Sequence, residues 1–278
     1  LWAGDSLTSK PRLEPLLTLA AVTSRTRKAR LGTAVLLAAL RHPVLLAHSA
    51  ASLDLLCGGR LTLAIGVGGA FTQDLKGDWL AAGVQPSQRA PRLEEMLVIM
   101  RRLWTEERVS FQGRFFTLAD VTLEPKPFQR PIPLWLACHY RSHKEAQYRR
   151  AALLGDGIIG ITDTPQEHAQ VLQRVKALAQ ESGRDPDSIT AAFYMTVNLN
   201  PDEGEAQREA ETFLLGYYGR NIWGDRWGPF GHPERTVTRM QEYLEAGSQT
   251  LVIRFAAYDQ RRQLHRFVEQ VLPAFKKA

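Results

Sequence analysis

The stretch LCGGRLTLAIGVGGAF, from Leu56 to Phe71, sets a short apolar run between two groups of glycines. The run itself is of strand length, and Gly66, Gly68 and Gly69 follow it at once. Such a turn is either a tight connection to the next helix or a loop whose main chain approaches a flat ligand closely. The rest of the chain must distinguish these two interpretations.

Outward from this stretch, strand-like apolar runs alternate with longer segments of helical periodicity. Strands are predicted at 1–4, 29–37, 60–68, 133–138, 156–161, 189–199 and 250–255. Helices are predicted at 14–27, 43–56, 89–104, 144–154, 165–182, 203–217, 233–246 and 260–275. Alternation of this kind indicates right-handed crossovers and a parallel sheet.

Two architectures share this pattern, an open doubly wound sheet and a (β/α)8 TIM barrel. A barrel typically needs about 250 residues, and the chain has 278. Seven predicted strands, the first cut at its start, indicate a barrel whose first βα unit is missing from the sequence. A β-hairpin excursion is predicted at 109–125, with its turn at Gly113. No linker or shift of composition divides the chain, so we expect a single domain over residues 1–278.

The net charge of +6 raises the question of nucleic-acid binding. The basic residues are spread along the chain, so we expect no nucleic-acid partner, and an anionic cofactor or substrate uses the same charge. No apolar run approaches the ~20 residues that cross a bilayer, and no secretory signal is visible. Two cysteines, Cys57 and Cys138, make no disulfide framework. We therefore expect a cytoplasmic protein without membrane contact.

Several common chemical motifs are missing from the sequence. There is no dinucleotide-binding G-x-G-x-x-G with its acidic residue, no phosphate-binding P-loop and no G-x-S-x-G hydrolase elbow. The histidines form no H-E-x-x-H or Cys/His cluster, so no metal site is expected. His139 alone lies at the carboxyl end of a predicted strand. The glycine-rich, aromatic segment 216–234 contains Trp223 and Trp227, and is a lid or binding loop, an oligomer contact or a disordered segment.

An ordered set of segments resembles the bacterial luciferase-like family, which comprises flavin-dependent monooxygenases and deazaflavin (coenzyme F-420) oxidoreductases. The resemblance extends over nearly the whole chain, and the arrangement HP…LD-L-x-GGR-L…G-x-G is its most specific part. The segments are WAGDSL, LRHPVLLAHSAASLDLLCGGRLTLAIGVGG, RLEEMLVIMRRLW, VSFQGRFFTL, PKPFQRPIPLWLA, RRAALLGDGII and PERTVTRMQEYLEAGSQTLVIRF.

The resemblance implies a barrel with an excursion, whose mouth is crossed by the flavin or deazaflavin ring. It implies a bulge in the strand from Gly32 to Leu37, with a cis peptide against the ring, which falls by position at Ala34–Val35. The loop Gly66 to Gly69 would lie near the ring's edge. The cofactor-binding residues implied are Asp5, Ala34, Val35, Gly66, Gly68, Gly69, Gly160, Ile161 and Thr162, the last three at the phosphate. The family is also commonly dimeric, so we expect a homodimer.

The sequence departs from the family at three places. Ser6 stands where many members have a histidine for proton transfer, and it cannot act as a base near neutral pH without a partner. Ala70–Phe71 stands where the F-420-dependent glucose-6-phosphate dehydrogenases carry a glutamate. Asp163–Thr164 stands where they tend to carry a lysine. These departures disfavour a sugar-phosphate substrate and favour FMN over F-420.

We therefore expect a monooxygenase that acts on a small organic substrate with dioxygen and reduced FMN. A flavin reductase would supply the reduced FMN. His139 and Ser6 are the candidate catalytic residues. The candidate substrate residues are Phe71, Trp223, Trp227 and, for an anionic group, Arg254. The alternatives are an F-420-dependent hydride-transfer oxidoreductase and a non-catalytic flavin-binding barrel, which Ser6 and the missing first strand favour.

Overall fold

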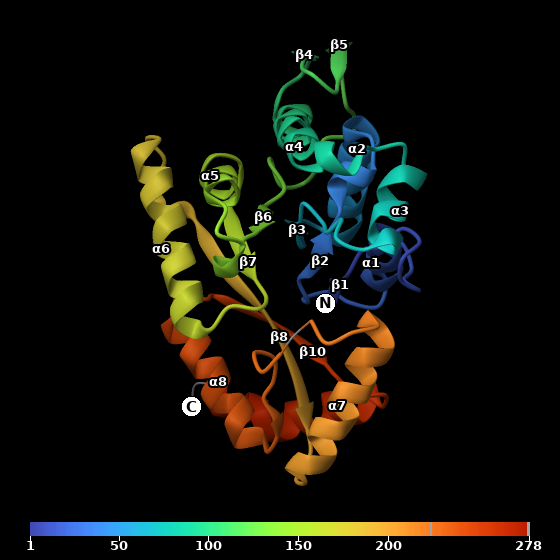
Figure 1. Cartoon of the computed structure of the whole chain (residues 1–278). Coiled ribbons are helices and arrows are strands. Elements are labelled where there is room, and N and C mark those ends of the chain that lie inside the picture. Colours follow the sequence, from blue (N-terminus) through green and yellow to red (C-terminus); the bar gives the residue numbers. More distant parts are fainter. Residues whose placement is uncertain (223, 277–278) are drawn as a thin grey trace. The chain divides into compact units, whose positions relative to one another are not determined.

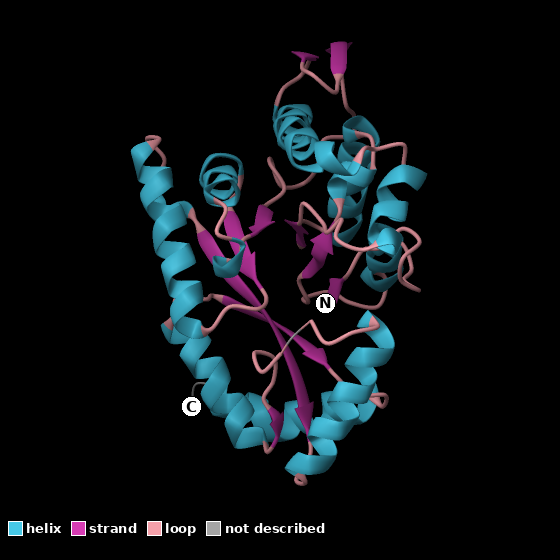
Figure 2. Cartoon of the chain, viewed as in Figure 1, coloured by secondary structure: helices cyan, strands magenta, loops and turns pink. Residues whose placement is uncertain are grey.

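A computed structural model describes residues 1–222 and 224–276 of the chain. It is an α/β fold in which helices alternate with parallel strands (Figures 1 and 2). Its internal contacts form two compact units. Unit 1 comprises residues 1–137, 145–158 and 178–189, and unit 2 comprises residues 138–144, 159–177 and 190–278. Trp223, in the predicted lid, lies outside the described residues.

Unit 1 contains the first strands of the sheet, which pair side by side in the order β1, β2, β3, β6, β7. These strands are β1 (Trp2–Ala3), β2 (Leu31–Leu36), β3 (Leu61–Ile65), β6 (Leu134–Ala137) and the start of β7 (Gly157–Gly160). The helices of this unit are α1 (Pro15–Thr23), α2 (Pro43–Cys57), α3 (Gln73–Ala81), α4 (Arg89–Thr105) and α5 (Glu145–Leu154). The antiparallel hairpin β4 (Val109–Gln112) and β5 (Thr117–Val121) projects beyond α4, as Figure 1 shows.

Unit 2 continues the strand order from the end of β7 through β8 (Thr190–Leu199) to β10 (Thr250–Phe255), and β8 and β10 are parallel. The two-residue β9 (Phe230–Gly231) pairs with β8. The helices are α7 (Glu203–Tyr218), α8 (Pro233–Glu245) and α9 (Gln260–Arg266). Helix α6 (Pro165–Glu181) begins in this unit and ends in unit 1. Short 3-10 or π turns lie at Ala38–Leu40, Pro86–Gln88, Tyr140–Ser142, Pro186–Ser188, Phe267–Val271 and Leu272–Phe275.

Local sequence explains where these elements begin and end. Pro43 opens α2, where its missing N–H costs nothing, and Gly58 ends the same helix in the left-handed conformation at φ +65°. Every residue of β3 is buried, as expected for a strand covered on both faces. Alternate residues of β8 contribute to an apolar core made by Phe193, Met195, Val197, Leu199, Met240, Tyr243, Phe267 and Val271.

All seven strands predicted from the sequence are present, and so is the predicted hairpin. Helix α3 was not predicted, because it contains Gly77 and several polar residues and shows no clear helical pattern of apolar residues. Only Asp78 and Trp79 of this helix are buried. The last predicted helix keeps regular α geometry only to Arg266 and continues as a π turn and a 3-10 turn. In the described part of the chain, no helix combines the length and apolarity needed to span a membrane.

Candidate cofactor and substrate site

The end of β2 in unit 1 carries the predicted irregularity. The peptide bond Ala34–Val35 is cis, which confirms the position that the resemblance implied. The pairing of β2 with β3 shifts register between Thr33 and Leu36, so the predicted bulge is also present. The Thr33 hydroxyl donates to the carbonyl of Ala64 at 2.8 Å and ties the two strands together just before the bulge.

The glycine loop after β3 lies directly against the end of β2. A Cβ placed on Gly66 would lie 2.7 Å from Val35 Cγ2, and the Gly66 amide donates to the carbonyl of Leu36 at 2.9 Å. The main chain of the two neighbouring strand ends is therefore in close contact. The space at Gly66 is filled by Val35, so packing alone requires a glycine there.

The other two glycines of the loop also have packing reasons. Gly68 has φ +76°, and its Cβ would lie 2.7 Å from Trp79 Cζ2. A Cβ on Gly69 would lie 2.5 Å from the ring of Phe71, whose side chain is 66% exposed. The tight-turn interpretation therefore accounts for all three glycines. Their contact with a cofactor stays a prediction.

Asp5 lies in the segment after β1 and is buried. Its carboxylate accepts hydrogen bonds from the Leu37 amide at 2.9 Å and from both terminal nitrogens of Arg41 at 2.6 and 3.1 Å. Arg41 also pairs with Glu14. Burial opposes the charge of Arg41, but the hydrogen bonds and charges of the two carboxylates outweigh it and raise its pKa. Asp5 thus holds the segment after β1 against the end of β2.

Ser6 belongs to a chain of hydroxyl groups. Its Oγ lies 3.0 Å from Ser9 Oγ, and Ser9 Oγ donates to Asp78 Oδ2 at 2.8 Å. Burial alone would raise the pKa of Asp78, but hydrogen bonds from Thr8 and Ser9 hold it below its usual value. Asp78 is therefore ionised and only accepts. Since Ser9 has a single hydroxyl proton and gives it to Asp78, Ser6 must donate to Ser9. The free lone pair of Ser6 can only accept a hydrogen bond.

In unit 2, His139 and Asp163 follow the ends of β6 and β7. Burial lowers the pKa of His139, so its ring is uncharged at neutral pH. The next residue, Tyr140, donates its amide to Asp163 Oδ1 at 3.1 Å. Asp163 is 1% exposed and its Oδ2 has no hydrogen-bond partner among the described residues. Burial raises the pKa of this carboxyl to about 6.

Asp163 is a candidate site residue that the sequence interpretation missed. It entered that interpretation only as the replacement of a lysine. Its position two residues beyond a predicted strand could have identified it, because carboxyl ends of parallel strands are where barrels place chemical groups. Its burial, however, depends on partners such as Tyr243, whose hydroxyl donates to the Asp163 carbonyl at 2.7 Å.

The start of α6 is closed by a capping box between Thr164 and Glu167. The Glu167 amide donates to Thr164 Oγ1 at 3.2 Å, and the Thr164 amide donates to Glu167 Oε2 at 2.9 Å. Arg226, from the loop after α7, forms two hydrogen bonds with the Glu167 carboxylate and donates to the Thr162 carbonyl at 3.1 Å. This loop is therefore fixed to the connection between β7 and α6.

An apolar cluster joins the same loop to the end of β7. Buried Trp227 belongs to it, and Ile161, Phe213 and Tyr218 pack against it. Gly160, the last residue of β7, packs tightly, because an added Cβ would lie 3.0 Å from His168 Nδ1 and from the Phe193 ring. The predicted residues Ile161, Thr162 and Trp227 are thus gathered in unit 2, while Asp5, Ser6, Val35 and the glycine loop belong to unit 1. No group of three metal-ligating side chains occurs in residues 1–222 and 224–276.

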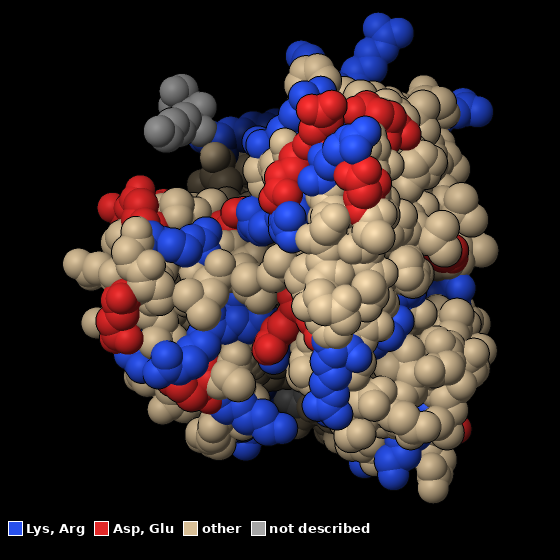
Figure 3. Space-filling view, turned by 90° about the horizontal axis from the view of Figure 1, so that it is seen from above, with Lys and Arg blue, Asp and Glu red and all other residues tan. Residues whose placement is uncertain are grey.

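Charged side chains of both signs are interspersed on the face shown in Figure 3. Cys57 and Cys138 are both buried, and neither forms a disulfide.

The fold is that of the luciferase-like (β/α) barrels. The chain matches the luciferase-like monooxygenase family over residues 1–265 and belongs to it. The predicted family and fold class are confirmed.

Curated relatives are similar over most of the chain. An F420-dependent glucose-6-phosphate dehydrogenase of Intrasporangium calvum is 28% identical, with 93% of this chain and 83% of the relative covered. The protein of the same name from Kribbella flavida is also 28% identical, with the same coverage of 93% and 83%.

Two solved structures resemble the fold closely. An F420-dependent secondary alcohol dehydrogenase in complex with an F420-acetone adduct has a TM-score of 0.82 at 19% identity, covering 99% of this chain and 90% of that one. The monooxygenase RslO1 from Streptomyces bottropensis has a TM-score of 0.80 at 25% identity, covering 95% and 83%. The chain is therefore an enzyme, a luciferase-like oxidoreductase, and the non-catalytic alternative has no support.

Proposed function

We propose that the protein is an F-420-dependent oxidoreductase that transfers hydride to or from a small organic substrate. The observation that carries this proposal is the similarity, over 93% of the chain, to relatives that are named as F420-dependent dehydrogenases. This similarity reverses the preference for FMN drawn from the sequence, and it supports the alternative of an F-420-dependent hydride-transfer oxidoreductase. That preference depended on three positions, whereas the similarity extends over nearly the whole chain.

The residues present fit a coenzyme that has a flat ring and a phosphate. In unit 1, the bulge at Ala34–Val35 and the adjoining Gly66 offer main chain rather than bulky polar side chains to a ring. In unit 2, the stretch Gly160 to Thr162 precedes the amino end of α6, where the helix dipole favours an anion. The guanidinium of Arg226 donates to the Thr162 carbonyl and pairs with Glu167, so it holds this stretch in place without adding net charge.

Bound F-420 would supply the hydride acceptor or donor. The chain's own residues must then move the accompanying proton. We assign this role to His139, whose uncharged ring can accept a proton, or to Asp163, whose buried carboxyl has a pKa of about 6. Ser6 accepts a hydrogen bond and holds no proton for transfer, so it orients a hydroxyl rather than ionising it.

The substrate is proposed to be other than glucose 6-phosphate, although relatives are named for that sugar phosphate. Asp163 replaces the lysine that the resemblance assigns to those enzymes. A buried acid in place of a cation removes an attraction for phosphate. Phe71 likewise presents an exposed apolar ring where they carry a glutamate.

A monooxygenase that uses reduced FMN, together with a flavin reductase, is the second candidate. The specific observation in its favour is the similarity to the monooxygenase RslO1 at 25% identity.

The two candidates differ in the cofactor that binds. We expect F-420 to bind the purified full chain, measured by fluorescence quenching, and to be reduced or oxidised without oxygen uptake. Arg226→Gln should weaken F-420 binding, while Arg261→Gln, which changes an exposed arginine of α9, should not. Binding of reduced FMN with oxygen uptake, and no binding of F-420, would establish the second candidate instead.

We also propose a homodimer formed through α1 and α2, which pack against each other in unit 1. Four leucines on or beside these helices have side chains that are 68–78% exposed, a high value for large apolar residues. They are Leu13, Leu17, Leu45 and Leu56. A second copy of the chain would cover this surface.

A further inference from the structure

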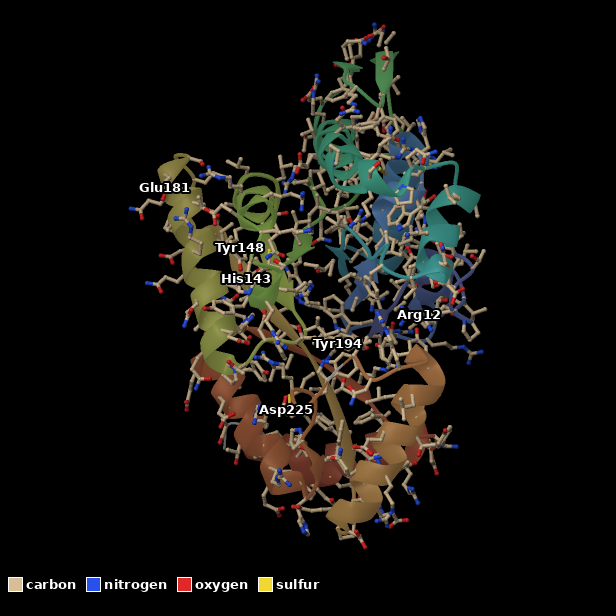
Figure 4. The ribbon with its side chains drawn as sticks, viewed as in Figure 1. Arg12, His143, Tyr148, Glu181, Tyr194 and Asp225 are labelled. Atoms are coloured by element: carbon tan, nitrogen blue, oxygen red, sulfur yellow. The ribbon has the colours of Figure 1, made fainter. Side chains whose placement is uncertain are left out.

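Arg254 lies on the face of β10 that does not contribute to the main core of unit 2. The neighbouring residues Leu251, Ile253 and Phe255 pack against that core. Because side chains alternate along a strand, Arg254 points to the opposite face. It is the register partner of Thr196 on β8, so the two side chains leave the sheet on the same side. Tyr194, labelled in Figure 4, precedes Thr196 by one pleat on that side.

The guanidinium of Arg254 is enclosed by aromatic side chains of α7. Its Cζ lies 4.5 Å from the ring centre of Tyr217 and 5.5 Å from those of Phe213 and Tyr218. One terminal nitrogen donates to the Tyr218 hydroxyl at 2.7 Å. The rings fix the plane of the guanidinium and favour its positive charge.

No carboxylate pairs with this cation among the described residues. Two other partly buried arginines, Arg41 and Arg226, form ion pairs with carboxylates. Burial opposes the charge of Arg254, but the adjacent tyrosines outweigh it and raise its pKa. A partly buried guanidinium that stays charged without a counter-ion is costly unless a ligand supplies one. Its remaining N–H donors form a planar fork that matches an oxyanion.

Thr196, the register partner of Arg254, adds a second polar group on the same face of the sheet. Its residue is 2% exposed, and its hydroxyl oxygen has no hydrogen-bond partner in the described part of the chain. Buried hydroxyls normally find a partner. A hydroxyl without a partner, on the same sheet face as a guanidinium without a counter-ion, is consistent with one ligand group that accepts hydrogen bonds from both.

We propose that Arg254 and Thr196 form a subsite for an oxyanion of the organic substrate, with the rings of Phe213, Tyr217 and Tyr218 beside it. This inference rests on the proposed oxidoreductase function and names its substrate class, a small organic acid. Arg254 supplies the charge and the fork, Thr196 supplies one hydroxyl donor, and the α7 rings accommodate the apolar part of the acid.

The first test measures anion binding without any cofactor, so it is independent of the F-420 assignment. Calorimetric titrations of the full chain use benzoate, its neutral analogue benzamide, and inorganic phosphate as probes. We expect benzoate to bind and benzamide to bind more weakly. Arg254→Gln should lower the affinity for benzoate by about tenfold or more. Arg254→Lys should keep part of the affinity, because it retains the charge but loses the fork.

Arg262→Gln changes an exposed arginine of α9 and is the matched control, which should bind benzoate like the unchanged protein. Circular dichroism melting shows whether each variant is folded. Thr196→Val keeps the shape of the side chain and removes the hydroxyl. It should lower the affinity for benzoate less than Arg254→Gln does. Equal benzoate affinity in the unchanged protein, Arg254→Gln and Arg254→Lys, or no binding of benzoate and phosphate at all, would overturn the subsite.

The second test separates substrate from cofactor as the source of the oxyanion. Benzoate is titrated again with F-420 present. Unchanged benzoate affinity supports a substrate subsite, and displacement of benzoate by F-420 overturns the assignment to the substrate. A protein that binds benzoate through Arg254 but never binds F-420 would contradict the proposed cofactor while leaving the anion site in place.

Discussion

Asp78 shows how a single buried carboxylate fixes the segment that contains Ser6. Its oxygens accept four hydrogen bonds, from the amide and hydroxyl of Thr8 and of Ser9, at 2.5–2.8 Å. These bonds stabilise the ionised form and lower the pKa of the carboxyl. They also dictate that Ser6 donates to Ser9.

At this residue scale, we expect Asp78→Asn to lower the free energy of unfolding at neutral pH by about 1–3 kcal/mol. The amide of asparagine presents one acceptor oxygen instead of two and places donors against donors. Thermal or urea unfolding measures the change. Asp74→Asn, an exposed acid in the first turn of the same helix, is the control and should change stability little.

The sign of the pH dependence follows from the lowered pKa. An acid whose folded pKa lies below its unfolded value stabilises the fold above the unfolded pKa, and loses this contribution as the pH falls through the folded pKa. The stability gap between the unchanged protein and Asp78→Asn should therefore narrow in acid. A gap that is absent at neutral pH, or that widens on acidification, would show that Asp78 does not have this role.

Residues of this kind mark the limit of sequence-based prediction. Ser6 and Asp5 were identified because they stand at positions of a recognisable segment. Their partners Asp78 and Arg41 were not, since hydrogen bonds to residues many positions away leave no local pattern. Arg254 was predicted as an anion-binding residue from its place near a strand end. Its aromatic surroundings depend on how α7 packs against β10.

At the scale of the element, the contact between β2 and β3 is set by the pair Val35 and Gly66. An added methyl at Gly66 would lie 2.7 Å from Val35 Cγ2, closer than carbon atoms pack. We expect Gly66→Ala to destabilise the protein by about 1–3 kcal/mol through overpacking. The double variant Val35→Ala/Gly66→Ala should recover part of that loss, because it removes the opposing methyl groups.

Gly77→Ala is a control that should change stability in the opposite direction. Gly77 lies inside α3 with no atom within 4 Å of an added Cβ, so Gly77→Ala should stabilise the helix by roughly 1 kcal/mol. The unfolding free energies of the unchanged protein, Val35→Ala, Gly66→Ala and the double variant give the coupling between the two positions. Additive effects of Val35→Ala and Gly66→Ala would mean that the two side chains do not constrain one another.

Elements with a strong period were predictable and those without one were not. The seven strands are apolar and mostly alternate with helices, and β10 was predicted at its observed bounds. Helix α3 has two buried residues in its nine, so its sequence carries almost no amphipathic signal. The bulge in β2 was predicted only through the family resemblance, because the residues of the strand do not by themselves distinguish a bulge from simple irregularity.

At the scale of the whole molecule, the predicted site residues divide between the two compact units. The residues assigned to the ring belong to unit 1, while those assigned to phosphate, proton transfer and substrate belong to unit 2, except for Ser6 and Phe71. Sequence order could not reveal this division, since the chain passes between the units within β7 and again within α6. The single domain expected from the sequence stays a prediction.

The homodimer is the prediction that concerns the molecule as a whole. Leu17 on α1 and Leu45 on α2 are 72% and 69% exposed, and a twofold axis would bring the same surface of two copies together. A glutamate at either position would place a charge in the apolar contact, without disturbing the buried residues of its helix. We expect sedimentation to give a dimer for the unchanged protein and a monomer for Leu17→Glu/Leu45→Glu. Leu264→Glu, at a 51% exposed leucine of α9, should remain dimeric. A monomeric unchanged protein, or a dimer that survives the double substitution, would leave these helices without the proposed partner.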